Sequence, residues 1–282
     1  MKQEEMQDNV VTVQKDDIKR GLSQLGVKSG DMIMVHSSLK SLGYIPGGAP
    51  TMIQALQETV GEEGILAMPA LVACADGGSR PPFNPATSPI EPWVGTIPET
   101  FRKSPGVLRS SHPTHSVCAW GKKAADFLAS SDPADVFAKD GPWGKLLNNG
   151  GKIVFIGEAI GGNTFLHACE AWILGYLDET FAWVETADGG KEQKFVRNYP
   201  GGCRGGWYKM GRNAPYFAKL IELGVPKEVH VGRGTITLMD PKELYQAMQR
   251  IFKEDAFILL HKEGCGDCAR IRGKIIAKQL GK

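Results

Sequence analysis

The sequence predicts an α/β fold: a layered α/β/α arrangement around a mostly parallel or mixed central sheet. Two observations lead to this prediction. Short apolar runs rich in β-branched residues alternate along the chain with segments of helical periodicity. The 282 residues are 42% hydrophobic and 23% charged, a balance typical of a globular protein with a substantial core. Because the chain shows no internal repeat and no low-complexity linker, we expect a single domain over 1–282.

The first third of the chain alternates strands with a helix. Residues 32–36 follow the turn at 28–31 and are expected to form a buried strand. Residues 51–60 carry apolar side chains at near-helical spacing, and Gly61 stands just past the expected end of that helix. A second strand is expected over 65–68, with Pro69 stopping it.

The rest of the chain repeats this alternation. Strands are expected over 116–120 and 152–156, each followed by a glycine. Residues 229–231 and 234–239 suggest a hairpin. Asp240-Pro241 then opens a helix, with the aspartate as N-cap and the proline in the first turn.

Residues 74–98 interrupt this pattern, because prolines recur through the second half of the segment. We expect an irregular excursion there. A loop of that length in a compact domain usually acts as a lid or a binding loop.

Composition and charge limit the classes of function. Lys+Arg 33 against Asp+Glu 31 gives a net charge of +2, and no basic stripe with interleaved aromatic residues is present, so nucleic acid is not an expected partner. No apolar run approaches the roughly 18 residues of a spanning helix, and residues 1–5 are acidic where a signal peptide would need positive charge followed by an apolar stretch. We therefore expect a cytoplasmic protein, without membrane association, whose six cysteines stay reduced.

The first motif lies at the end of the 32–36 strand, where His36-Ser37-Ser38-Leu39 is followed by the glycine pair Gly47-Gly48. Hydroxyls and a glycine-rich turn before a helix can supply donors for a phosphate. An ordinary strand-to-helix connection has the same appearance. The spacing matches neither the dinucleotide-binding glycine pattern nor the P-loop.

The second motif contains two histidines, His112 and His115, on either side of Pro113-Thr114. They could be zinc ligands, a base or a hydrogen-bonded structural pair. No third ligand at a metalloprotease-like spacing accompanies them, which disfavours a metal. Pro113 prevents a regular helix and places His112 at the mouth of a strand, where catalytic groups of α/β proteins collect.

The third motif is His167 with Glu170, at the start of a helix that Asn163 or Thr164 can cap. A spacing of three puts both side chains on one helix face. The carboxylate can hold one tautomer of a neutral imidazole, which is the form that a general base needs. The alternative is a purely structural ion pair. Cys169 is a less suitable nucleophile, because neighbouring residues in a helix point to different faces.

Cys265 and Cys268 form a Cys-x-x-Cys pair, with His261 nearby and Cys203 earlier in the chain. These residues could make a tetrahedral zinc site, although a second Cys-x-x-Cys or paired histidines are missing. Loosely buried or exposed thiols are the preferred interpretation. A structural zinc ion stays an open alternative, so no metal site is assigned from the sequence.

Taken in order, these segments resemble the aminoglycoside 3-N-acetyltransferase family, antibiotic N-acetyltransferases that differ in fold from the GCN5-like enzymes. The resemblance covers about residues 14–250, and the C-terminal tail, about 255–282, falls outside it. The GCN5-like pyrophosphate signature is absent. The matching segments are 35–39, 41–43, 47–48, 60–61, 64, 68–69, 107–110, 112–113, 119–121, 150–153, 157, 163–164, 166–167 and 170.

The resemblance implies transfer of an acetyl group from acetyl-CoA to the 3-amino group of an aminoglycoside. A small-molecule amine is thus the expected partner, and the chain would be a monomer or a homodimer. Two rival functions stay open: a related acyltransferase acting on a different amine metabolite, and a zinc-stapled binding protein that uses Cys203, Cys265 and Cys268.

The resemblance also implies roles for individual residues. His167 corresponds to the catalytic histidine and Glu170 to its glutamate, and His112 corresponds to a histidine near the acceptor. The coenzyme site is assigned to His36, Ser37, Ser38 and Leu39, together with Ser110. Acceptor binding is assigned to His115 and to Asp76, the acidic residue nearest to the place where the family carries acids. Further acids expected to help hold a polycation are Glu91, Asp132 and Asp135.

Overall fold

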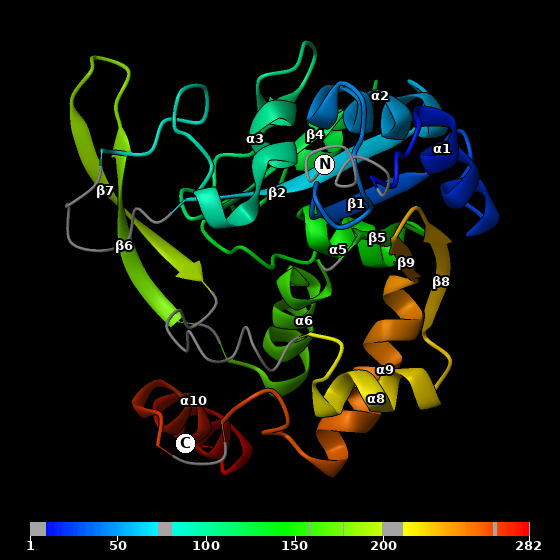
Figure 1. The fold of residues 1–282 in the computed structure, drawn as a ribbon. Helices are drawn as coiled ribbons and strands as arrows, with labels where there is room; N and C mark the ends of the chain where they lie inside the picture. Colours follow the sequence, from blue (N-terminus) through cyan, green and yellow to red (C-terminus); the bar gives the residue numbers. More distant parts are fainter. Residues whose placement is uncertain are drawn as a thin grey trace, which may run out of the picture.

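The computed structural model describes residues 10–72, 81–157, 159–176, 178–198, 211–261 and 264–281. Its centre is a seven-stranded sheet in the order β3-β4-β2-β1-β5-β9-β8 (Figure 1). β1 runs parallel to both β2 and β5, and the other pairs are antiparallel. This mixed sheet confirms the predicted α/β class. The strands are β1 (Met32–Ser37), β2 (Ile65–Leu71), β3 (Leu108–Arg109), β4 (His115–Trp120), β5 (Lys152–Ile156), β8 (Pro226–Val231) and β9 (Gly234–Met239).

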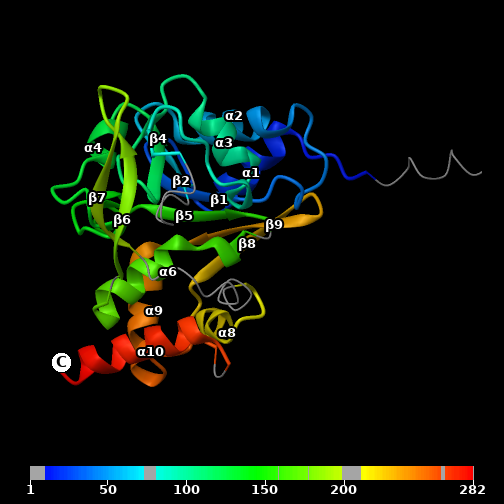
Figure 2. The same ribbon diagram turned by 90° about the vertical axis from the view of Figure 1, so that its left-hand side faces the viewer.

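Helices cover both faces of the sheet, because alternate side chains of each buried strand enter two different cores. Ile33 and Val35 of β1 pack in one core, and Met34 packs in the other. Figure 2 shows α1, α2 and α3 on one side of the sheet, where the first core lies, and most of the remaining helices on the other side. The helices are α1 (Lys15–Gln24), α2 (Gly48–Val60), α3 (Thr96–Arg102), α4 (Ala124–Leu128), α5 (Pro142–Asn148), α6 (Thr164–Cys169), α8 (Pro215–Glu222), α9 (Pro241–Glu254) and α10 (Gly266–Gln279).

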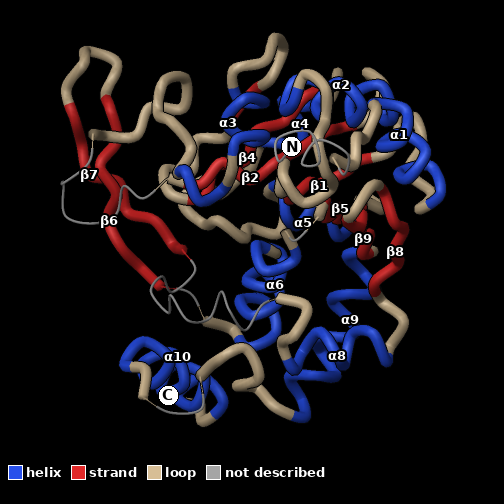
Figure 3. The backbone as a smooth tube through the Cα atoms, viewed as in Figure 1, coloured by secondary structure: helices blue, strands red, loops and turns tan. Residues whose placement is uncertain are grey.

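A two-stranded sheet, β6 (Asp178–Glu185) with β7 (Lys191–Asn198), stands beside the main sheet (Figure 3). Sequence patterning did not predict this hairpin. It has its own small core, in which Phe83 packs with Ala182, Val184 and Val196. Single bridges, Phe83 with Val184 and Asp135 with Arg197, join it to neighbouring loops.

The strand β2 continues through Pro69 to Leu71, so the prediction that Pro69 stops it is wrong. β1 pairs with β2 only as far as Ala67, whereas β4 pairs with β2 along to Leu71. Beyond Ala67 one side of β2 is therefore an edge, where a residue without an N–H group is tolerated. The other predicted strands and the 229–239 hairpin are confirmed, and the helix expected over 51–60 begins earlier, at Gly48.

The proline-rich excursion is described from residue 81 onward, where it is irregular apart from the short turn η1 (Pro92–Val94) before α3. Arg109 fixes this segment to the sheet. Its guanidinium group donates to the carbonyl oxygen of Ser88 at 2.6 Å, to that of Ala70 at 2.9 Å and to Ser116 Oγ at 2.8 Å. The same group lies 5.0 Å from the ring centre of Phe83.

After β5 the chain forms the turn η2 (Ile160–Gly162), then α6, and then a single π-helical turn, η3 (Glu170–Leu174). α10 packs against η3, since Ile271 and Ile275 are buried in the same core as Leu174 and Tyr176. Within the ranges given above, no helix is both long and apolar enough to cross a bilayer.

Candidate active site

An open pocket of about 490 Å³ lies beyond the carboxyl ends of β1 and β2. This edge is where α/β sheets with parallel strands usually bind their ligands. The residues predicted to contact a coenzyme, His36 to Leu39, all line the pocket. The rest of its wall comes from Val35, from Lys40, from Pro69 and Leu71 of β2, from residues 93–96 and Pro98, and from Ala159, Gly161, Gly162 and Thr164.

Two polar atoms in this wall are buried and have no hydrogen-bond partner among the described residues: His36 Nε2 and Ser37 Oγ. The His36 ring stacks on Phe155, with ring centres 5.1 Å apart. Burial lowers the pKa of His36 to about 3, so the ring is neutral near pH 7. Buried polar groups are nearly always satisfied in folded proteins, so these atoms are candidates for contacts with a ligand.

Two of the groups that the sequence predicted as phosphate donors have other partners or another position in the structure. The Ser38 N–H group already donates to the carbonyl oxygen of Ile156 at 2.9 Å, and Ser38 Oγ accepts from Ser41 at 2.7 Å. The Gly47-Gly48 turn begins α2 and does not line the pocket. Lys40, an exposed cation on the pocket wall, was missed although it directly follows the motif. A phosphate bound in this pocket would therefore lie near the ammonium group of Lys40 and not near the Gly47-Gly48 turn.

His167 and Glu170 form the pair that their spacing predicts. Asn163 caps α6, because its side chain accepts from the N–H group of Phe165 at 3.1 Å. His167 Nδ1 lies 2.8 Å from Glu170 Oε2, and the two residues are 8% and 2% exposed. Little water reaches the pair, so the carboxylate fixes the orientation of the imidazole ring.

The second oxygen of Glu170 has a partner that sequence reasoning missed. The Tyr176 hydroxyl donates to Glu170 Oε1 at 2.9 Å. Glu170 begins the π-turn, and the turn ends at Gly175, whose φ of 71° lies in the left-handed region that favours glycine. This reversal brings Tyr176 back toward Glu170. π-turns occur frequently at functional sites.

A second pocket of about 300 Å³ contains both histidines of the other motif. His115 opens β4 directly opposite Leu71, a residue of the first pocket, so the two pockets adjoin across β2. Burial lowers the pKa of His115 well below its usual value, and the nearby His112 and His167 lower it further.

Ser110 lines this second pocket and not the first, apart from the other four residues assigned to the coenzyme, so its coenzyme contact stays a prediction. The sheet order is the reason, because β4 and β2 separate the edge strand β3, which ends just before Ser110, from β1. The Ser110 hydroxyl accepts from the N–H group of Val117 at 2.9 Å.

His112 is held by backbone groups on both sides of its ring. Nδ1 accepts from the N–H group of His115 at 3.1 Å, and Nε2 lies 3.3 Å from the carbonyl oxygen of Arg197. Burial lowers the pKa of His112 to about 4. These contacts make His112 a neutral side chain in the pocket wall with both nitrogens engaged.

The described acids that were expected to hold a polycation are buried or lie beside a cation of the protein itself. Asp76 lies outside the described residues, and Glu91 is buried. Asp132 forms an ion pair with Arg197, and Asp135 lies 3.6 Å from the same guanidinium group. Of these acids only Asp135 lines the second pocket, where burial raises its pKa.

Among the cysteines that the structure describes, none is placed to act as a nucleophile in either pocket. Cys169 is fully buried, and burial raises its pKa well above the usual value, so the thiolate is disfavoured. Cys203 lies outside the described residues. Cys265 and Cys268 lie with His261 near the start of α10, a segment that lines neither pocket.

Comparison with known proteins adds to this geometry. Residues 34–253 match the family model described as aminoglycoside 3-N-acetyltransferase. The chain is 31% identical over 178 residues to aminoglycoside N(3)-acetyltransferase VII of Streptomyces paromomycinus, which is 56% of this chain and 60% of that protein. It is 33% identical over 174 residues to the prophage-derived acetyltransferase-like protein YokD of Bacillus subtilis (strain 168), 55% of this chain and 64% of that protein. The matched region thus spans less than two thirds of these relatives.

Solved structures match over more of the chain. Aminoglycoside acetyltransferase AAC(3)-IVa in complex with a gentamicin superposes with a TM-score of 0.79 at 26% identity, covering 95% of this chain and 100% of that one. The binary complex of AAC-IIIb with CoASH gives a TM-score of 0.74 at 25% identity, covering 86% and 97%.

Proposed function

The chain belongs to the aminoglycoside 3-N-acetyltransferase family, and we propose that it transfers the acetyl group of acetyl-CoA to the 3-amino group of an aminoglycoside, with His167 as general base. The observation that carries this proposal is the buried chain of hydrogen bonds from Tyr176 through Glu170 to His167. Its His167 end lies one helical turn after Thr164, a residue that lines the first pocket.

The hydrogen bond to Glu170 assigns the roles of the two imidazole nitrogens. Nδ1–H donates to the carboxylate, which leaves the lone pair on Nε2 to accept a proton. The amine attacks the thioester carbonyl as its proton passes to Nε2, and the imidazolium ion is stabilised by Glu170. Collapse of the tetrahedral intermediate expels the coenzyme thiolate, which takes the proton back.

We assign the coenzyme to the first pocket. Its volume of about 490 Å³ suits a small-molecule ligand. Lys40 offers a cation to a phosphate, and the buried Ser37 hydroxyl offers a hydrogen bond that nothing else among the described residues takes up. The relative with bound CoASH supports this choice of ligand.

We assign the acceptor to the side of His167 that faces His115 and the second pocket. Asp135 supplies a carboxylate there, and the neutral His115 can accept a hydrogen bond from an amine or hydroxyl. The relative with a bound gentamicin supports an aminoglycoside as acceptor.

A second candidate keeps the mechanism and changes the acceptor to an amine metabolite of lower charge. The observation that favours it is Arg197, which already pairs with both Asp132 and Asp135 and offsets their charge. A polycation gains less from carboxylates that are already compensated.

A coupled measurement separates these outcomes. Calorimetry with acetyl-CoA should show micromolar binding, about −8 kcal/mol, weakened in Lys40→Ala and unchanged in Lys227→Ala on the exposed strand β8. Thiol release is then followed across aminoglycosides with a 3-amino group, aminoglycosides lacking it, and simple amines. Turnover confined to the first group supports the main proposal, and turnover confined to simple amines supports the second candidate. No coenzyme binding at millimolar concentration overturns both.

A further inference from the structure

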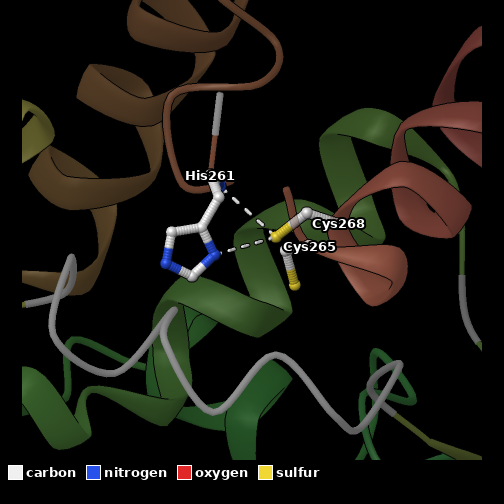
Figure 4. Close-up of side chains that lie close together, drawn as sticks. All are labelled: His261, Cys265 and Cys268. Atoms are coloured by element: carbon white, nitrogen blue, oxygen red, sulfur yellow. Dashed lines mark hydrogen bonds between the residues drawn. The ribbon is translucent and has the colours of Figure 1, made fainter. Parts of the chain in front are cut away.

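The C-terminal tail brings together three side chains that neither pocket uses. His261 follows α9, Cys265 precedes α10, and Cys268 lies in the first turn of α10 (Figure 4). One ligand atom of each residue lies within 4.8 Å of the corresponding atoms of the other two. Cys268 is 1% exposed, and the other two are partly buried.

The spacing of these atoms suits a tetrahedral ion. With a Zn–S distance of about 2.3 Å and a Zn–N distance of about 2.05 Å, a sulfur and a nitrogen ligand lie about 3.6 Å apart, and two sulfur ligands about 3.8 Å. His261 Nδ1 and Cys268 Sγ are 3.4 Å apart, and all three atoms meet the wider limit of 4.8 Å. Small side-chain movements would bring the three ligand atoms to the distances of a tetrahedral zinc site.

Hydrogen bonds fix the backbone around this cluster. Both sulfurs lie at the N-terminal end of the 14-residue helix α10. The N–H group of His261 donates to Cys268 Sγ at 3.3 Å. Arg272 donates to the carbonyl oxygen of His261 at 2.7 Å, which adds a positive charge beside the cluster and fixes the backbone of a ligand.

We propose that His261, Cys265 and Cys268 bind one zinc ion, with a fourth ligand completing the tetrahedron. Two thiolates and an imidazole form a donor set that selects zinc over magnesium, calcium or manganese. The imidazole argues against a simple redox pair, because a disulfide between the two cysteines has no need of a ring nitrogen at 3.4 Å. This site replaces the sequence-based preference for loose thiols.

The ion joins the segment after α9 to the first turn of α10. Ile258, Leu259 and Leu260 on one side, and Ile271 and Ile275 on the other, enter the same core as Leu174 and Tyr176. The zinc site thus fastens α10 beneath the turn that presents Glu170 and Tyr176. Its role is structural, because its residues line neither pocket.

Metal analysis of the untagged protein tests the proposal without reference to catalysis. We expect about one zinc per chain after dialysis against a weak chelator. The two variants His261→Ala and Cys265→Ser should retain zinc only at background levels. The matched control, His230→Ala on the exposed face of β8, should retain it in full.

Measurements on the unaltered chain keep the test decisive if a variant fails to fold. A strong chelator should lower Tm by roughly 5 °C or more, and added zinc should restore it. Exchange with Co²⁺ should give the absorption of a tetrahedral thiolate site. Zinc-free protein whose mass is two hydrogens lower and rises on reduction would identify a disulfide and overturn the proposal. Full zinc retention in Cys265→Ser would also overturn it.

Discussion

His36 and His167 are both buried at the carboxyl edge of the sheet, and their surroundings differ completely. His36 lies on a strand end and stacks on Phe155, and its Nε2 atom has no partner among the described residues. His167 lies in the first turn of a helix with a carboxylate at 2.8 Å, and that carboxylate is itself held by Tyr176. Burial alone keeps the His36 ring neutral, whereas the carboxylate beside His167 fixes the orientation of its ring, which is the arrangement that the proposed general base requires.

The largest expected effect comes from removing the paired ring. His167→Ala should lower kcat by roughly 10²–10⁴ while coenzyme affinity stays nearly unchanged, because the general base is lost and the first pocket is intact. Steady-state kinetics with calorimetry measure both quantities. Near-normal kcat in a folded His167→Ala protein would move the base to His115, since both ring nitrogens of His112 are engaged by backbone groups.

Changing Glu170, the partner of the His167 ring, should lower kcat by less than removing the ring does. Glu170→Gln still accepts a hydrogen bond from the imidazole but cannot compensate the positive charge formed during proton transfer, so kcat should fall by roughly 10–10². Thiol-release rates at saturating substrates provide the measurement. A loss as large as that of His167→Ala would mean that Glu170 itself touches the reacting groups.

The unpaired ring should matter for acid stability. The pKa of His36 is about 3 in the folded chain against 6.5 ordinarily, so between these pH values only the unfolded chain binds the proton. Stability therefore falls as the pH falls, by roughly 2 kcal/mol at pH 5 from this group. His36→Phe should remove that part of the loss.

Urea unfolding at pH 7.5 and pH 5 measures this difference. Because the pKa of His112 is also lowered, to about 4, the variant keeps part of the acid sensitivity. His230→Phe on the exposed strand β8 is the control and should behave like the unaltered chain. Equal pH sensitivity in His36→Phe and the control would show that His36 is accessible to protons in the folded state.

The smallest effect tests the outer end of the hydrogen-bond chain. Tyr176→Phe removes one hydrogen bond to Glu170, worth about 0.5–1.5 kcal/mol, so kcat should fall roughly 2–10-fold with little change in either KM. Tyr44→Phe, on the exposed surface before α2, should leave kcat unchanged. A fall in coenzyme affinity with unchanged kcat would place Tyr176 in a binding role.

Local patterns predicted the parts of the site that depend on a few neighbouring residues. The three-residue spacing of His167 and Glu170 is sufficient to put them on one helix face, and the hydroxyls after a strand are sufficient to place them at the sheet edge. Tyr176 could not be found in this way, because its approach depends on a π-turn that ends at Gly175. The turn adds no recognisable residue pattern.

Features set by strand order are not encoded in local patterns. Ser110, which was assigned to the coenzyme, lies two strands away from β1, and no local pattern gives that order. Pro69 was expected to end a strand, but whether a proline is tolerated depends on which side of the strand has a neighbour.

The attachment of the excursion by Arg109 has a consequence for the kinetics of ligand binding. Besides the Arg109 contacts, the N–H group of Glu91 donates to the carbonyl oxygen of Leu71, and that of Ile90 to Glu99. The segment leading into the pocket wall at 93–98 is thus fastened before any ligand arrives. Association should then proceed at the speed of diffusional encounter, without a slow isomerisation. The heat-capacity change should then include no contribution from folding of the described segment 81–98.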